Sequence, residues 1–176
     1  MSATTQNTFI GLGANQDEPT RFLEQAKREL ENIPAWQCRA WSSLYWTEPQ
    51  GVRQQQWFAN QVAWLQLPLD ATPQHTVEIL LEIETRLGRV RGQRWGPRCI
   101  DLDLLVLGEQ CSNTAQAHVP HPRLTERAFV LVPLAELAPE LILPGFRQST
   151  LELLAKVNYR CEGNTIWQTQ STTLTF

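Results

Sequence analysis

Two aspartates and four arginines stand close together between residues 88 and 107. The segment opens with the arginines among glycines and a proline, a composition typical of a loop. It continues into a leucine-rich run that carries Asp101 and Asp103 and predicts a β-strand. Carboxylates are ligands for Mg²⁺, and guanidinium groups bind phosphate oxygens. The segment therefore indicates phosphoryl-type transfer. Its arginines are Arg89, Arg91, Arg94 and Arg98.

Strand alternation predicts that the two aspartates share a face, because successive side chains point to opposite sides of a sheet. We expect one face to carry Ile100, Leu102, Leu104 and Val106, and the other Asp101, Asp103, Leu105 and Leu107. The Cα atoms of the aspartates should then lie about 6.5–7 Å apart, which suits cations about 3.5–4 Å apart. An Asp-x-Asp pair also occurs on plain exposed strands. The leucines after it and the arginines before it favour a metal site.

Composition limits the class of protein. A chain of 176 residues with 42 % hydrophobic content fits one domain, which we place at 1–176. The net charge of −3 argues against a nucleic-acid or membrane-surface binder, and the clustered basic residues point to a small anionic ligand. We find no signal peptide, no membrane-spanning run and no metal-binding cysteine spacing, so we expect a cytoplasmic protein. The oligomeric state is open, with a monomer as the working expectation.

Hydrophobic periodicity predicts the remaining elements. Strands are expected over 9–12, 38–46 and 58–67, and helices over 19–33, 73–87, 125–137 and 150–157. The order β-α-β-β-α-β, followed by C-terminal helices, is an α+β, ferredoxin-like arrangement. It places two helices on one face of an antiparallel sheet and leaves the other face for a ligand. Residues 163–176 form a C-terminal extension, either an added edge strand or a loose tail.

Asn60 is an amide on an otherwise apolar strand face, shared with Phe58 and Val62. A buried amide needs a hydrogen-bond partner. Either Asn60 stands at an edge position or makes a cross-strand hydrogen bond, or its amide recognises a flat heterocycle. The sequence leaves both interpretations open.

Three segments together resemble the 6-hydroxymethyl-7,8-dihydropterin pyrophosphokinase family. They are 88–91, 94–98 with 100–103, and 119–122 with 127–129, and the resemblance extends from about residue 9 to about residue 143. It implies that pyrophosphate moves from ATP to the hydroxymethyl group of the dihydropterin and that AMP is released. It also implies two Mg²⁺ ions and a place in folate biosynthesis.

The resemblance also implies roles for individual residues. Asp101 and Asp103 would hold both metal ions, and Arg89 and Arg98 would act with them in catalysis. The ATP-binding residues would be Arg89, Arg91, Arg98, Ile100, His121 and Arg127. The pterin would be bound by Thr47, Phe58, Asn60, Trp95, Asp101 and Phe129. Trp95 would cover the pterin or seal the site.

The sequence also suggests two other hypotheses. Departures from the family pattern keep open a catalytically idle relative that binds pterin or nucleotide; they are Ala14, Gln50, Leu81 and Pro122. An RNA-binding ferredoxin-like module lacks the glycine–aromatic strand signature and has the wrong net charge, so we set it aside. No residue in the motifs stands out as a general base. The expected partners are ATP and a pterin, with no nucleic acid and no membrane.

Overall fold

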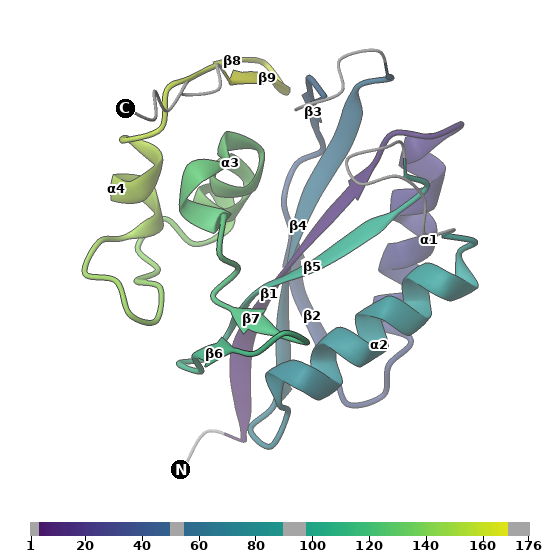
Figure 1. Ribbon diagram of the computed structural model, residues 1–176, viewed down its shortest axis with the longest axis vertical. Helices are drawn as coiled ribbons and strands as arrows, with labels where there is room; N and C mark the ends of the chain where they lie inside the picture. Colours follow the sequence, from purple (N-terminus) through teal and green to yellow (C-terminus); the bar gives the residue numbers. More distant parts are fainter. Residues whose placement is uncertain (1–3, 50–54, 90–97, 169–176) are drawn as a thin grey trace.

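The computed structural model describes residues 4–49, 55–89 and 98–168 (Figure 1). In this part of the chain a seven-stranded sheet has the order β5-β1-β4-β3-β9-β8, and β2 pairs with β4 beside β3. The three longest strands are β1 (Thr5–Ala14), β4 (Phe58–Pro68) and β5 (Asp101–Leu107), with β5 at one edge of the sheet. The remaining strands are β2 (Gln37–Trp41), β3 (Tyr45–Thr47), β8 (Tyr159–Glu162) and β9 (Thr165–Gln168). A small hairpin, β6 (Ser112–Asn113) and β7 (His118–Val119), forms a separate two-stranded sheet.

Helices cover both faces of the sheet, so the fold is α+β as predicted (Figure 1). One face packs against α1 (Pro19–Glu31) and α2 (Pro73–Arg86). The opposite face packs against α3 (Ala128–Leu137) and α4 (Thr150–Leu154). The C-terminal helices therefore cover much of the face that we expected to be left for a ligand. Among the described residues, no helix is both long and apolar enough to span a bilayer.

The helix boundaries follow from local sequence signals. Pro19 occupies the first turn of α1, where its missing N–H costs nothing, and α1 buries Leu23, Ala26 and Leu30. Thr72 caps α2, because its side chain accepts a hydrogen bond from the backbone N–H of His75 at 3.3 Å. Amphipathic helices of this kind are held mainly by the apolar face that they bury.

Two apolar clusters sit on the two faces of the sheet. The larger one joins the sheet to α1 and α2 through side chains such as Ile10, Leu65 and Leu80. The second joins it to α3 and α4, and in it Phe9 stacks on Trp64 with ring centroids 5.8 Å apart. Strands β1, β4 and β5 are therefore buried on both faces along part of their length.

A bulge in β5 changes the predicted alternation. Phe9 of β1 lies opposite Val106, whereas the next residue, Ile10, lies opposite Leu104. Leu105 is the extra residue, and the strand therefore shifts its side-chain alternation by one. The prediction was wrong for the end of the strand: Val106 packs toward α3, and Leu107 packs toward α1 and α2. The aspartates precede the bulge and keep their shared face.

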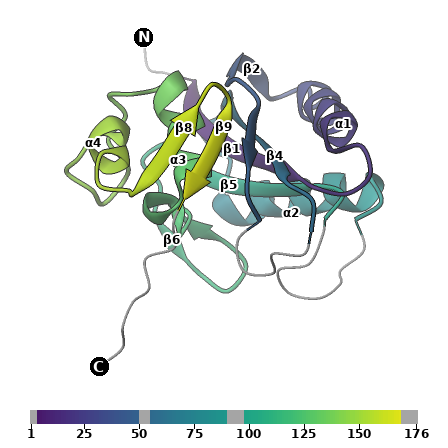
Figure 2. The ribbon, with the colours of Figure 1, turned by 90° about the horizontal axis from the view of Figure 1, so that it is seen from above.

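Three further expectations are corrected. The strand expected over 38–46 is divided into β2 and β3. The helix expected over 125–137 consists of a short 3-10 turn, η1 (Leu124–Glu126), then Arg127 in an extended conformation, and then α3. The sheet is not purely antiparallel, because the C-terminal hairpin returns alongside β3 and β9 pairs with it in parallel (Figure 2). Residues 165–168 of the C-terminal extension thus belong to the sheet.

We predict that Ser149→Ala lowers the free energy of unfolding by about 1 kcal/mol. The Ser149 side chain accepts from the Glu152 N–H at 3.3 Å, and the Glu152 carboxylate accepts from the Ser149 N–H at 2.8 Å. Chemical denaturation measures the change. Ser149→Asp retains a capping oxygen and is expected to stay near wild type. Equal losses in both variants would contradict a capping role.

Candidate active site

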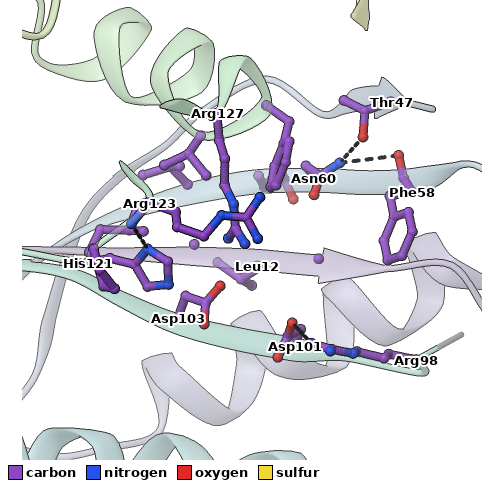
Figure 3. Close-up of a pocket in the computed structure, with 18 of the residues that line it drawn as sticks. Leu12, Thr47, Phe58, Asn60, Arg98, Asp101, Asp103, His121, Arg123 and Arg127 are labelled. Carbon is purple, nitrogen blue, oxygen red and sulfur yellow. Dashed lines mark hydrogen bonds and ion pairs between the residues drawn. The ribbon is translucent and has the colours of Figure 1, made fainter. Parts of the chain in front are cut away.

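A cavity of about 380 Å³ opens on the face of the sheet beside the start of α3 (Figure 3). Its floor is formed by β1, β4 and β5, and its other sides come from β3, from the segment after β7, and from α3. Gly11 and Gly13 of β1 contribute to the floor. A Cβ atom on Gly13 would lie 3.2 Å from the Asn60 amide oxygen, so a glycine keeps this floor open.

Asp101 is held at the edge of the cavity by two guanidinium groups. Arg89 Nη1 lies 2.8 Å from Asp101 Oδ1. Arg98 Nη1 pairs with Asp101 Oδ2 (Figure 3). Both carboxylate oxygens of Asp101 are therefore engaged. Arg89 and Arg98 were predicted to bind phosphate, and Asp101 was predicted to bind metal. The structure pairs the two arginines with this aspartate.

Glu84 of α2 contacts both Arg89 and the start of β5. Its side chain is buried, it pairs with Arg89, and its Oε1 accepts the backbone N–H of Leu102 at 2.7 Å. Burial raises the pKa of Glu84, while the Leu102 N–H and the Arg89 charge oppose that rise. Glu84 thus connects α2 to β5 and to Arg89. The sequence offered a signal that we did not use, a glutamate where the helix pattern requires an apolar residue.

Asp103 lines the same cavity two residues further along β5 than Asp101. Burial, followed by the negative charge of Asp101, raises the pKa of Asp103, whereas Arg127 and Arg98 act in the opposite direction. An acid in such a place is stabilised in its charged form by a cation. The Asp101–Asp103 pair is therefore suited to bind a divalent metal ion. Within the described ranges, no group of three or more His, Cys, Asp or Glu side chains could hold a metal ion.

His121 is fixed against the edge of β5. Its backbone N–H donates to the Leu105 carbonyl at 3.0 Å, and its Nδ1 accepts from the Arg123 N–H at 3.2 Å (Figure 3). Burial, followed by the charges of Arg127 and Arg123, lowers the pKa of His121 to about 4. The imidazole is therefore neutral near pH 7, and its proton resides on Nε2 as a hydrogen-bond donor.

Arg127 enters the cavity from the extended residue between η1 and α3. Its guanidinium carbon lies 5.4 Å from the Phe129 ring centroid, which fits a cation–π contact. The Nε atom is buried, and it has no hydrogen-bond partner among the residues that the structure describes. Burial lowers the pKa of Arg127, and so does the charge of Arg123. A buried guanidinium of this kind is suited to an anionic ligand.

The opposite end of the cavity is formed by Thr47, Phe58 and Asn60 (Figure 3). The Asn60 amide nitrogen donates to Thr47 Oγ1 at 2.8 Å and to the Phe58 carbonyl at 3.3 Å. The cross-strand interpretation of Asn60 is therefore confirmed. The functional interpretation stays open, because Asn60 also lines the cavity and its amide oxygen is not used in either of these bonds.

Asn15 joins the segments that flank the cavity, and the sequence analysis missed it. Its side-chain oxygen accepts the Arg98 N–H at 2.8 Å, and its amide nitrogen donates to Gln55 Oε1 at 3.0 Å and the Gln56 carbonyl at 3.1 Å. Asn15 is buried at the end of β1. It therefore holds the residues before β4 and before β5 to one another.

The structure brings most of the predicted residues to one cavity. Those that line it are Thr47, Phe58, Asn60, Arg98, Asp101, Asp103, His121, Arg127 and Phe129. Arg89 contacts Asp101 from behind. Ile100 does not line the cavity, because strand alternation turns its side chain into the core beside α1 and α2. Arg91 and Trp95 lie outside the described residues.

Known proteins resemble this chain in sequence and in fold. The family model for 7,8-dihydro-6-hydroxymethylpterin-pyrophosphokinase matches residues 9–139. The chain belongs to this family. It is therefore a pyrophosphokinase, as the resemblance predicted.

Two curated relatives, both named 2-amino-4-hydroxy-6-hydroxymethyldihydropteridine pyrophosphokinase, agree with this assignment. The protein of Pseudomonas aeruginosa is 43% identical over 150 residues, 85% of this chain and 91% of that protein. The protein of Methylorubrum extorquens is 42% identical over 151 residues, 85% of this chain and 92% of that protein.

A solved structure of the HPPK-DHPS protein of Plasmodium falciparum resembles this fold with a TM-score of 0.69. The identity is 14%, so the likeness concerns the fold alone. The match covers 86% of this chain and 43% of that longer chain, so this chain spans less than half of it.

We predict that Glu84→Ala lowers the free energy of unfolding by about 1–3 kcal/mol, because the buried Leu102 N–H loses its acceptor. Glu82→Ala is the matched control, since Glu82 lies on the same helix with an exposed side chain. Glu84→Gln retains an acceptor and should be intermediate. Urea denaturation measures all three, and equal stability of Glu84→Ala and Glu82→Ala would contradict the role.

We also predict that the His121 ring titrates near pH 4 in a nuclear magnetic resonance experiment. Folded His121 binds its proton less readily than the unfolded chain. Its contribution to stability is therefore lost as the pH falls from about 6.5 toward about 4. His121→Gln identifies the resonance and removes that part of the pH dependence. A midpoint near 6.5 would show that His121 is neither buried nor fixed as described.

Proposed function

We propose that this protein transfers the pyrophosphoryl group of ATP to the hydroxymethyl group of 6-hydroxymethyl-7,8-dihydropterin, releasing AMP, in folate biosynthesis. The observation that carries the proposal is the composition of one cavity. Two carboxylates from one strand face guanidinium groups, and an amide and aromatic rings lie at the other end. Family membership supports the same reaction.

The carboxylate pair fits Mg²⁺. This ion takes one or two protein carboxylates and completes its shell with water and substrate phosphates, which is the donor set that Asp101 and Asp103 offer. Bound Mg²⁺ would supply neutralisation and polarisation of the phosphate oxygens. We infer that the two aspartates hold two ions. Asp101 must exchange at least part of its contact with Arg89 and Arg98 for a metal ion.

The guanidinium groups bind the phosphate chain. Arg89 and Arg98 stand beside Asp101, where they are placed to take up phosphate charge once metal competes for that carboxylate. Arg127 and the Nε2–H of His121 donate from the far side of the cavity. We assign Arg91 to the same task. The substrate hydroxyl then attacks the β-phosphorus in line. The bond between this phosphorus and the oxygen bridging to the α-phosphate breaks, AMP leaves, and the hydroxyl proton is released to water.

The pterin end uses shape and hydrogen bonding. Phe58 and Phe129 come from different elements and offer ring surface to a flat heterocycle. Asn60 is oriented by its two donated hydrogen bonds, so its oxygen is the group that reads the ring edge. Thr47 supports that amide, Asp101 lies between the two substrates, and we assign Trp95 to cover the ring.

We also infer a ferredoxin-like core within a single domain, 1–176. The antiparallel strands β5, β1 and β4, with β2 and β3 along the outer edge of β4, support this topology. Helices α1 and α2 follow β1 and β4 in the chain and cover one face. We place the protein in the cytoplasm as a monomer, with ATP and pterin as its ligands.

The test is AMP formation from ATP, Mg²⁺ and the dihydropterin. We predict that Asp103→Asn reduces turnover by about 10²–10³-fold or more, because a main site of charge stabilisation is lost. Asp70→Asn, an exposed aspartate outside the cavity, should retain turnover. Removal of Mg²⁺ with a chelator should abolish it. Wild-type protein that binds ATP without releasing AMP would instead identify an idle relative.

A further inference from the structure

Arg123 lines the cavity, although neither the motifs nor the resemblance assigned it a role. It precedes the short turn η1 and follows His121 by two residues. Figure 3 shows Arg123 with His121 at one end of the cavity, away from Thr47 and Phe58. By the proposed function this end holds the nucleotide, because the flat substrate belongs to the aromatic end.

The backbone and the side chain of Arg123 have separate contacts. The backbone N–H donates to His121 Nδ1 at 3.2 Å, which directs the imidazole proton to Nε2. The side chain extends into the cavity, and its Nε lies 3.9 Å from Glu126 Oε2, at the outer limit for an ion pair. Its exposed fraction is 38%, so that pair contributes little energy. A substitution at position 123 therefore alters the guanidinium and keeps the backbone donor.

Arg123 and Arg127 place two like charges on one side of the cavity. Figure 3 shows their guanidinium groups on the side facing Asp103 and Asp101. The proximity is costly, because the charge of Arg123 adds to the burial that lowers the pKa of Arg127. Arg127 Nε also lacks a partner in the described part of the chain. A shared anion between the two guanidinium groups would compensate both features.

We propose that Arg123 is a phosphate-binding residue that, with Arg127 and His121, holds the phosphate that remains on the nucleotide. This inference rests on the proposed function and adds a third donor at the AMP end of the site. A guanidinium holds two N–H donors in a fixed planar fork that matches two oxygens of one phosphate, whereas an ammonium is a compact point charge. Arg123 would thus bind ATP before transfer and AMP after it.

The experiment is a calorimetric titration of AMP, and of ATP with Mg²⁺, into wild-type protein and Arg123→Met. We expect both dissociation constants to rise about 10- to 100-fold, the usual loss for a charged hydrogen bond. The KM for the dihydropterin should stay within about twofold. Arg123→Lys retains the charge without the fork and should recover only part of the affinity.

Arg39→Met is the matched control, because Arg39 is exposed on β2 and is not among the residues that line the cavity. Arg39→Met changes the net charge by the same amount as Arg123→Met. It should bind AMP with the affinity of the wild-type protein. Unchanged AMP and ATP affinity in Arg123→Met would overturn the inference, and so would a loss confined to the pterin. Failure of the proposed function would give a different result. Wild-type protein would then release no AMP from ATP and the dihydropterin, whatever the nucleotide affinity of Arg123→Met.

Discussion

The buried ion pair between Glu84 and Arg89 is the interaction on which the site depends. Arg89 connects this glutamate with Asp101, while Glu84 also accepts the Leu102 N–H. Strand β5 lies at the edge of the sheet and pairs there only with β1 among the strands of the main sheet that the structure describes. The contact with α2 therefore helps to define where β5 begins. Because Asp101 is the first residue of β5 and Asp103 follows on the same face, both acids take their position from that point.

Charge is divided between two sides of the cavity. The carboxylates come from β5, and the donors of the opposite side come from the segment between β7 and α3. Burial disfavours the charged form of each group of like charges, as the raised pKa of Asp103 and the lowered pKa of Arg127 indicate. A metal-bound polyphosphate satisfies both sides, since its cations meet the acids and its oxygens meet the arginines. The repulsion between like charges lowers the stability of the ligand-free protein. Its relief on binding contributes to the affinity for the polyphosphate.

Much of the site could be predicted because its residues lie in short, recognisable segments. Asp101 and Asp103 are two residues apart, and strand alternation alone places them together. Motifs around His121 and Arg127 came from family resemblance, and the structure brings both to the same cavity. Glu84, Asn15 and Arg123 were missed. Each acts through partners far away in the sequence or through a turn, and neither periodicity nor composition reveals such contacts.

The sequence by itself determined the α+β class, most of the elements and the chemistry of the Asp-x-Asp segment. These features depend on local propensity, on periodicity and on residue type, all of which are properties of neighbouring residues. Tertiary structure decided the bulge at Leu105, the parallel entry of β9 beside β3, and the covering of the second face by α3 and α4. It also decided that Arg123 faces the cavity. These features depend on which strands pair and on how helices distant in the sequence pack against them. Register and burial are therefore properties of the assembled sheet.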